Sequence, residues 1–331
     1  MPTDSLNIMK NSDIAKAVQV LREGGLVAFP TETVYGLGAD ASNELAVRKV
    51  FQAKARPADH PLIVHIGSVN ELLDWAEVVP PAAKQLMDAF WPGPLTLVFK
   101  KRSYVLASVT GGQDTVAVRM PSHPIASELL QAYGKGLVAP SANQFTHLSP
   151  TSAAAVREEL GSVIDLILDG GACELGLEST ILDVSREKPV ILRPGMITRT
   201  MLENVLGEPI LVATNETTTR APGRHHLHYA PTTKTILLPT EKVAAYARSL
   251  TPADLPVVFV VRHETVLPHE TGNIHWVTMP PAAKDYAHEL YRMLRTLDQQ
   301  HYQQIIIEDV PLAPEWEAIR DRLTKASYTQ C

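Results

Sequence analysis

The sequence predicts an α/β protein. A mixed, twisted, partly antiparallel sheet with helices is expected first, followed by a small C-terminal parallel α/β domain of Rossmann-like type. Apolar runs of strand length are interspersed with helical patterns in the first part of the chain. Residues 212–231 lose that periodicity and have the composition of a linker, and beyond them strands and helices alternate regularly. We therefore expect domains at 1–211 and 232–331, joined by 212–231.

The first elements follow from local signals. Ser12 is a plausible cap for a helix that ends at Gly24-Gly25, and the apolar strand 26–29 comes next. Apolar residues at helical spacing predict a second helix over about 45–51, and residues 61–66 read as a strand buried on both faces. Residues 80–90 are expected to be helical, and further strands are expected at 95–99, 115–119, 136–140, 163–168, 179–184 and 190–193.

In the C-terminal part, strands are expected at 235–238, 257–261, 275–279 and 305–308, and helices at 242–249, 282–297 and 316–326. Strands that alternate with helices predict a small parallel sheet with crossover helices.

Composition bounds the class of protein. The chain has 331 residues, of which 45% are apolar and 20% are charged, as in soluble globular proteins. We expect no membrane segment and no signal peptide, and hence a cytoplasmic protein. The net charge of −6 argues against stable nucleic-acid binding. Cys173 and Cys331 are too few for a disulfide framework or a zinc site.

Residues 29–40, Phe-Pro-Thr-Glu-Thr-Val-Tyr-Gly-Leu-Gly-Ala-Asp, are the most informative stretch. An apolar strand there runs into hydroxyl groups and a flexible glycine turn before a helix, where a chain can cradle an anion. Gly36-x-Gly38-x-x-Ala41 is also a loose dinucleotide fingerprint, but the acidic residue expected downstream is represented only by Asp59. Nicotinamide binding is therefore disfavoured.

Cations and small polar groups follow the strands and helices of this region. Lys54 and Arg56 share a face only if the chain there is extended, which Pro57 favours. Taken alone, both could be helix-end charges that complement the helix dipole. Ser141 and Asn143 follow the strand 136–140, and an ordinary turn would use the same residues.

Three further residues have an ordinary structural interpretation beside a functional one. Thr33 could cap a helix or bond within a turn. His65 lies in an apolar strand, where a core histidine is the commoner role. Arg119 could be an outward-facing charge on its strand.

Four more motifs occur in order: Trp91-Pro-Gly-Pro-Leu-Thr-Leu-Val98, Thr115-Val-Ala-Val-Arg-Met-Pro121, Glu178-Ser-Thr-Ile181 and Leu192-Arg-Pro-Gly195. Together with Lys-x-Arg and Ser-x-Asn, this series resembles the threonylcarbamoyl-AMP synthase family, whose catalytic module is the YrdC-like domain. Ala221-Pro-Gly and His228-Tyr-Ala-Pro231 are typical of its longer, two-domain form. The resemblance is specific over residues 12–231 and looser beyond, where Asp-Arg-Leu at 321–323 is kept without the expected preceding glycines.

The resemblance implies a nucleotidyltransferase that makes threonylcarbamoyl-AMP and pyrophosphate from L-threonine, bicarbonate or CO2, and ATP with Mg²⁺. The product would serve a downstream threonylcarbamoyl transferase machinery that forms N6-threonylcarbamoyladenosine in tRNA. Negative charge accumulates among these substrates, so cations must offset it. A phosphate loop of the G-x-x-x-x-G-K-[ST] type does not occur in the sequence, so dispersed side chains would hold the nucleotide.

The resemblance also assigns residues. The catalytic residues would be Lys54 and Arg56. L-threonine would be bound by Thr33, His65, Arg119, Ala139 and Ser179. ATP would be bound by Arg56, His60, Thr115, Ser141, Asn143, Ser149, Arg193 and Tyr229. No protein side chain is assigned to a metal.

His225, His226 and His228 resemble a metal cluster, but Cys, Asp or Glu at ligand spacing does not accompany them. The resemblance makes this segment an interdomain loop over the active site. Its residues 224–227 depart from the sequence common there, which predicts an altered lid affinity or pH response.

Two other functions remain open from the sequence. One is a carbamoyltransferase like the hydrogenase-maturation proteins, although the acylphosphatase and zinc-finger segments of those proteins do not occur here. The other is an RNA-binding module, which a failure to see salt-dependent RNA binding would exclude.

Overall fold

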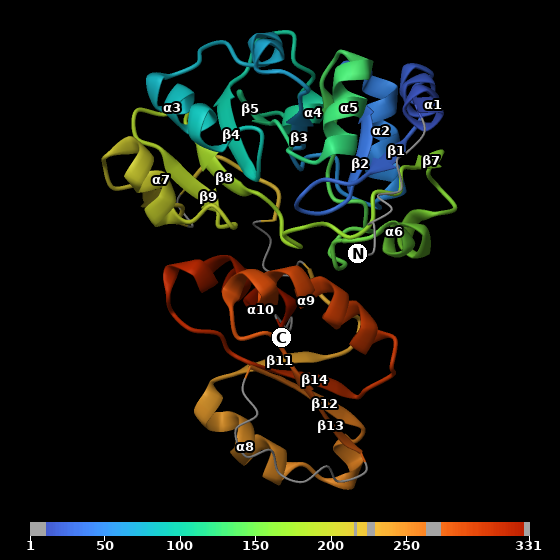
Figure 1. The fold of residues 1–331 in the computed structure, drawn as a ribbon, viewed down its shortest axis with the longest axis vertical. Helices are drawn as coiled ribbons and strands as arrows, with labels where there is room; N and C mark the ends of the chain where they lie inside the picture. The colour runs from blue at the N-terminus through green and yellow to red at the C-terminus, as the bar shows by residue number, and fades with distance from the viewer. Residues whose placement is uncertain (1–10, 215–216, 224–228, 263–272, 328–331) are drawn as a thin grey trace, which may run out of the picture.

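The structure is a computed structural model that describes residues 11–214, 217–223, 229–262 and 273–327. The described chain contains two separate β-sheets. A large sheet occupies the N-terminal part, and a small sheet lies below it in Figure 1. This arrangement confirms the predicted fold class, whereas the exact domain bounds stay a prediction.

The large sheet has ten strands in the order β10-β9-β8-β4-β5-β3-β6-β2-β1-β7. Its strands are β1 Val27–Phe29, β2 Gly36–Asp40, β3 Ile63–His65, β4 Leu95–Lys100, β5 Thr115–Arg119, β6 Leu137–Val138, β7 Leu166–Ile167, β8 Thr180–Asp183, β9 Val190–Arg193 and β10 Leu211–Val212. β3 pairs with β5 in parallel, but β5 pairs with β4 antiparallel. The sheet is therefore mixed, as the sequence predicts.

The helices of the same part are α1 Asn11–Arg22, α2 Glu44–Ala53, α3 Pro81–Phe90, α4 Ala107–Thr110, α5 Pro124–Tyr133, α6 Ala153–Leu160 and α7 Arg199–Leu206, with a short 3-10 helix Val69–Asp74. Helices α1, α2 and α3 match the sequence prediction. The sequence interpretation missed α5, α6 and α7. The largest cluster of buried apolar side chains lies in this domain and includes Leu37, Phe51 and Phe99.

The glycine turn predicted at residues 36–38 is wrong, because these residues belong to strand β2. Val27 of β1 lies opposite Gly38, and Phe29 lies opposite Gly36. A Cβ atom on Gly38 would lie 2.8 Å from the Phe29 ring. The glycines therefore permit close packing within the sheet, and the polar residues that precede them form the loop.

The prediction that the chain is extended from Lys54 to Arg56 is also wrong. Lys54 caps α2, and Ala55 has a left-handed φ of 49°. The N–H of Ala55 donates to the Gln52 carbonyl at 3.1 Å, and the N–H of Arg56 donates to the Phe51 carbonyl at 3.0 Å. This pair of bonds is a Schellman ending, so a helix cap orients both cations.

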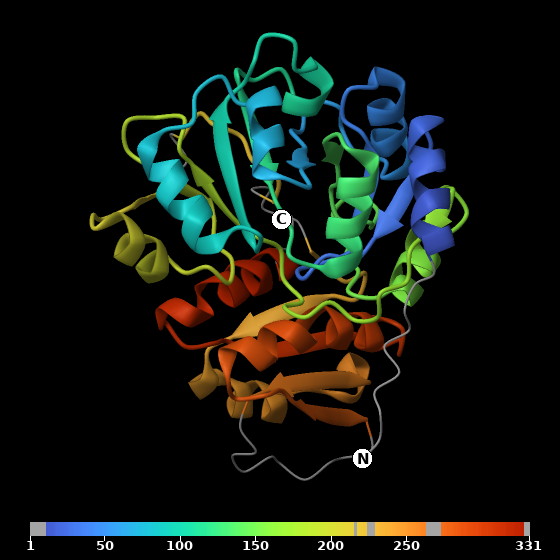
Figure 2. The ribbon, with the colours of Figure 1, turned by 45° about the horizontal axis from the view of Figure 1, so that its top comes forward.

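The small sheet is parallel throughout and has the order β11-β14-β12-β13. Its elements are β11 Thr235–Leu238, α8 Thr240–Ser249, β12 Val257–Val261, β13 Ile274–Thr278, α9 Ala283–Asp298, β14 Gln304–Glu308 and α10 Glu317–Ala326, with short 3-10 helices Pro252–Asp254 and Pro314–Trp316. α9 and α10 lie on the face toward the large sheet, and α8 lies on the opposite face (Figures 1 and 2). The predicted parallel sheet with crossover helices is confirmed.

The two parts share an apolar core. Val34, Leu148 and Leu177 of the N-terminal part belong to the same buried cluster as Leu290 and Leu294 of α9. An interface of this kind gains stability from the burial of apolar surface. α9 therefore packs directly on loops of the large-sheet domain.

Gly176 lies where a loop of the large-sheet domain crosses α9. Its φ is +76°, and a Cβ atom there would lie 2.7 Å from the carbonyl oxygens of Ala287 and His288. We expect Gly176→Ala to cost about 2 kcal/mol, because the added methyl group meets rigid backbone. Urea unfolding measures the change.

Gly134 provides the matched control, because its φ is +72° and nothing lies within 4 Å of its would-be Cβ. Gly134→Ala carries the same backbone strain without the clash. Equal losses of stability in the two variants would contradict close packing at the domain interface.

Candidate functional site

A pocket lies at the ends of several strands of the large sheet, and Pro222, Gly223 and Tyr229, which precede the second domain, form part of its lining. It is lined by Thr33, Val34, Arg56, Ile63, His65, Arg119, Ala139, Pro140, Ser141, Glu178, Ser179, Arg193, Pro222, Gly223 and Tyr229. The lining comes from the β1–β2 loop, the end of α2, several strand ends and the interdomain segment. The fold thus brings together most of the residues predicted to bind threonine and ATP.

Arg119 ends β5 and is buried, with 4% of its surface exposed. Its Nη2 lies 2.7 Å from the Glu32 carboxylate. Its Nη1 donates to the Thr33 hydroxyl at 2.9 Å, and its Nε donates to the Gly93 carbonyl at 3.3 Å. The outward-facing alternative is wrong. A guanidinium held in this way keeps further N–H donors for a carboxylate in the pocket.

His65 ends β3, directly opposite Arg119 of β5. Its ring is buried, and its Nδ1 lies 3.3 Å from the Ile63 carbonyl oxygen. Burial, and then the charge of Arg119, lower the pKa of His65 to about 3. The imidazole is therefore neutral at ordinary pH and presents an uncharged polar group to the pocket.

The lowered pKa of His65 predicts a pH dependence of stability. The unfolded chain takes up a proton at His65 below about pH 6.5, whereas the folded chain does so only near pH 3. Stability contributed by the neutral ring is therefore full above pH 6.5 and is lost as the pH falls toward 3. We expect wild type to lose up to about 2 kcal/mol more than His65→Gln between about pH 6.5 and pH 4.5.

Urea unfolding at a series of pH values measures this difference. The exposed His275→Gln is the control, and it should retain the wild-type slope. A His65→Gln variant with the wild-type slope would contradict the buried neutral histidine.

Two arginines form the cationic side of the pocket. Arg56 Nη2 donates to the Pro61 carbonyl at 2.9 Å, and burial lowers the pKa of Arg56 to about 10. Arg193 donates from Nε and Nη2 to the Ser179 carbonyl at 3.1 and 2.8 Å. Both guanidinium groups are charged and held in place, as phosphate binding requires.

Lys54 is absent from the pocket lining, but it contacts the lining residue Ser141. It is 2% exposed, and its Nζ donates to the backbone carbonyls of Ser141 and Asn143. The Asn143 amide in turn donates to the carbonyls of Gln144 and His147 at 2.7 and 2.9 Å. Lys54 and Asn143 therefore hold the loop that carries Ser141. Burial, and then the charge of Arg56, lower the pKa of Lys54 well below its usual range.

Ser149, His60 and Thr115 also lie outside the pocket lining. The Ser149 hydroxyl donates to the Glu178 carboxylate at 2.5 Å. The His60 ring packs edge-on against Phe145 at 5.2 Å. Thr115 begins β5, at the end of the strand away from Arg119. Their assignment to ATP stays a prediction.

The sequence interpretation assigned no role to Glu32, Glu178, Tyr291 or Arg322. Glu32 and Glu178 stand inside the quoted motifs, beside assigned residues. For Arg322, the sequence did contain a pattern that could have indicated a buried, functional side chain. It lies on the buried face of α10, together with Ile319, Leu323 and Ala326, where an apolar residue is expected.

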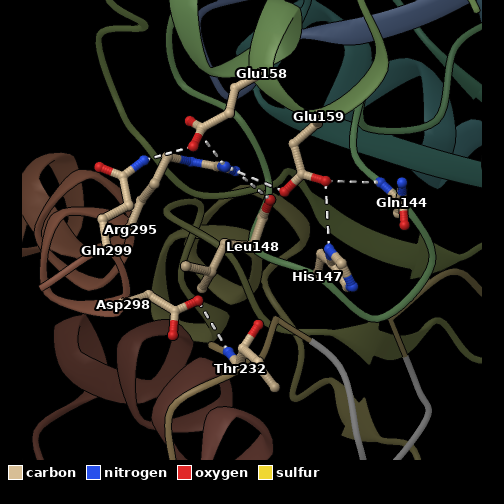
Figure 3. Close-up of a pocket in the computed structure, with 10 residues that line it drawn as sticks. Gln144, His147, Leu148, Glu158, Glu159, Thr232, Arg295, Asp298 and Gln299 are labelled. Atoms are coloured by element: carbon tan, nitrogen blue, oxygen red, sulfur yellow. Dashed lines mark hydrogen bonds and ion pairs between the residues drawn. The ribbon is translucent and has the colours of Figure 1, made fainter. Parts of the chain in front are cut away.

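A second pocket lies between the domains (Figure 3). There Arg295 of α9 lies between Glu158 and Glu159 of α6, at 3.8 and 3.1 Å. Glu159 also pairs with His147 at 3.3 Å. These contacts join α9 to α6, and the lining contains none of the predicted binding residues. We place the candidate site at the first pocket, because the predicted cations and hydroxyl groups converge there.

Two further features concern metals and membranes, and both apply to the residues that the structure describes. Those residues contain no group of three or more His, Cys, Asp or Glu side chains that could hold a metal ion. Their helices are all too short or too polar to cross a bilayer. His225, His226, His228 and the departure at residues 224–227 lie outside the described residues.

The fold and the pocket define a class: a two-domain α/β protein with a buried, cation-rich site for small anionic ligands. Two family models match the chain. The Sua5/YciO/YrdC model, described as telomere recombination, matches residues 19–195, and the threonylcarbamoyl-AMP synthase C-terminal domain model matches residues 197–327. The chain belongs to the Sua5/YciO/YrdC family and has the two-domain form.

Relatives match over nearly the whole chain. A threonylcarbamoyl-AMP synthase of Pyrococcus abyssi is 40% identical over 320 residues, covering 94% of this chain and 93% of that protein. One of Bacillus subtilis is 39% identical over 332 residues, covering 98% and 95%. The crystal structure of P. abyssi Sua5 complexed with L-threonine has a TM-score of 0.85 and 38% identity, covering 95% of this chain and 94% of that one.

Proposed function

We propose that this protein is a threonylcarbamoyl-AMP synthase. It joins L-threonine, bicarbonate or CO2, and ATP, and it releases pyrophosphate. The main support for this proposal is that residues from separate motifs, which are predicted to bind threonine and ATP, line one pocket. The names of the full-length relatives support the same activity.

The chemistry requires that two anions meet. The threonine amine forms a bond to the carbon of CO2 and loses a proton, which gives an N-carboxylate. An oxygen of this carboxylate attacks the α-phosphorus of ATP, the bond to the bridging oxygen breaks, and pyrophosphate leaves. Charge therefore accumulates at the reacting atoms, and fixed cations stabilise it. In this proposal Arg56 and Arg193, which line the pocket, are the cations that stabilise it.

In this proposal, Arg119, Thr33 and Ser179 bind L-threonine at one end of the pocket. Arg119 supplies the bidentate partner of the substrate carboxylate. The neutral His65 contacts the amino acid without adding charge, and Ala139 contributes its backbone. At the other end, Ser141, Arg193 and Tyr229 bind the nucleotide.

Mg²⁺ is proposed as part of the MgATP substrate. The described residues offer no cluster of carboxylates for an all-protein site. Mg²⁺ usually binds substrate phosphates and water with only one or two carboxylates. The triphosphate would then supply most of its ligands.

The test is pyrophosphate release by the full-length protein with ATP, Mg²⁺ and carbon-labelled bicarbonate, each substrate being omitted in turn. We expect release that depends on both L-threonine and bicarbonate, with label in an adenylate product. Release that is independent of L-threonine, or no release at all, would exclude the synthase.

The chemistry of the product indicates which class of enzyme would use it. A threonylcarbamoyl adenylate is an activated acyl donor, so we propose that a threonylcarbamoyl transferase machinery acting on tRNA consumes it in the cytoplasm. The synthase itself needs no stable contact with nucleic acid, in keeping with its net charge of −6.

A further inference from the structure

A buried cluster joins the C-terminal domain to the candidate pocket. It consists of Glu178 and Tyr229, which line the pocket, and of Tyr291 and Arg322, which come from α9 and α10. We infer that Tyr291 and Arg322 are positioning residues for the nucleotide end of the active site. This inference rests on the proposed function and assigns a role in it to the C-terminal domain.

Arg322 is the largest fully buried side chain described, with none of its side-chain surface exposed. Its Nε donates to the Glu178 carboxylate at 2.9 Å, and its Nη1 donates to Asp321 at 2.6 Å. Its guanidinium carbon lies 5.0 Å from the centre of the Tyr229 ring. A buried guanidinium is costly unless it is paired, so these contacts fix it in one geometry.

Tyr291 reaches the same two pocket residues. Its hydroxyl lies 3.0 and 3.3 Å from the two carboxylate oxygens of Glu178. Its ring stacks on Tyr229, with 5.8 Å between the ring centres and 29° between the planes. The C-terminal domain thus contacts Glu178 through a cation and a hydroxyl, and contacts Tyr229 through a cation and a ring.

Tyr229 needs this support. It has a left-handed φ of 59°, which is strained for a residue with a side chain. A Cβ atom on the neighbouring Gly223 would lie 2.2 Å from its hydroxyl, so the ring fits closely in its place. Contacts from the second domain therefore help to set the orientation of a side chain that lines the pocket.

The charge of Glu178 is also controlled from the C-terminal domain. Burial by itself raises the pKa of Glu178, but the charges of Arg322 and Arg193 and the bond from Ser149 lower it to about 2. A carboxylate in the lining would repel a triphosphate at short range. Arg322, which lies outside the lining, offsets part of that charge, so less of the charge of the lining residue Arg193 is needed to balance Glu178.

The threonine end is supported differently. The ion pair and hydrogen bonds of Arg119 go to Glu32, Thr33 and Gly93, all in the large-sheet domain. Ser179 bonds to Thr96 at 2.7 Å in the same domain. Loss of Tyr291 or Arg322 should therefore weaken nucleotide binding and leave threonine binding nearly unchanged.

Calorimetric titration of the full-length protein tests this split. The ligands are L-threonine and, with Mg²⁺, an ATP analogue that has a methylene bridge between the α and β phosphorus atoms. In Arg322→Met we expect the affinity for the analogue to fall at least about tenfold, while the threonine affinity stays within about twofold. Tyr291→Phe keeps the stacked ring and loses only the hydroxyl, so a smaller fall of about threefold is expected.

The controls match the chemistry at remote sites of the same domain. Arg248→Met removes an exposed arginine of α8, and Tyr246→Phe removes a hydroxyl that donates to Gln304 at 2.8 Å. Both should bind the two ligands as wild type does. If Arg322→Met does not fold, Arg322→Lys keeps the positive charge without the fork and should show the same split.

A double variant that removes both charges separates positioning from general damage. In the double variant Glu178→Gln with Arg322→Met, the unpaired buried carboxylate is gone, so part of the nucleotide affinity lost in Arg322→Met should return. Equal loss of both ligands, unchanged analogue affinity in the single variants, or no recovery in the double variant would overturn the inference.

Failure of the proposed function looks different. A wild-type protein that binds the analogue but releases no threonine-dependent pyrophosphate is not the proposed synthase, and the binding split still tests Tyr291 and Arg322. A wild-type protein that does not bind the analogue would overturn both proposals.

Discussion

We expect the Arg119→Lys variant to bind L-threonine about 100-fold more weakly than wild type. Arg119 uses two of its five N–H donors on Thr33 and Gly93, its Nη2 forms an ion pair with Glu32, and further donors remain for the pocket. A lysine ammonium is a point charge that cannot span Glu32 and Thr33 while it binds a carboxylate bidentately. Loss of a charge-assisted, bidentate contact in a buried site corresponds to about 3 kcal/mol.

Isothermal calorimetry with L-threonine measures this loss, and thermal unfolding shows whether the fold survives. Arg48→Lys is the matched control, because Arg48 pairs with Glu44 on an exposed helix surface at 3.0 Å. That variant should bind threonine as wild type does. If Arg119→Lys retained threonine affinity within about twofold, Arg119 would not be the carboxylate-binding residue.

The second large effect is expected at Lys54. In Lys54→Met the stem keeps its volume, but the carbonyls of Ser141 and Asn143 lose their donor in a buried place. The loop that carries Ser141, a residue of the pocket lining, should therefore shift. We expect kcat for pyrophosphate release to fall by about 100- to 1000-fold, the usual cost of a lost preorganised donor.

The measurement is the rate of pyrophosphate release at saturating substrates, with threonine affinity as a second readout. Threonine binding should change much less than kcat, since Lys54 does not line the pocket. Lys84→Met, an exposed lysine of α3 in the same domain, is the control. An unchanged kcat in Lys54→Met would leave this residue with a role in stability alone.

Much of the fold could be predicted because the signals are local. The four C-terminal strands are apolar runs of strand length, and the structure has β11 and β12 at the predicted residues. Helix α9 has its apolar residues on one face, which predicts both its type and its buried side. By contrast, the sequence interpretation missed α5, α6 and α7.

Errors arose where a local signal has two physical causes. Glycine suits a turn because it lacks a Cβ, and for the same reason it suits a strand packed against an aromatic ring, as Gly38 is against Phe29. Pro57 restricts only Arg56, the residue directly before it, so it does not prevent Ala55 from taking the left-handed conformation of a helix ending. Only neighbours that are distant in sequence distinguish these cases.

The sequence by itself determined the family, the fold class and most of the pocket residues, because motifs keep their chemistry and order along the chain. The tertiary structure alone decided which of them share a pocket and which contact the lining residues from outside the pocket. It separated Arg119, which lies in the lining, from Lys54, which does not, and it brought Arg322 to Glu178 across 144 positions. The physical reason is that burial and pairing are properties of three-dimensional neighbours, which spacing along the chain does not encode.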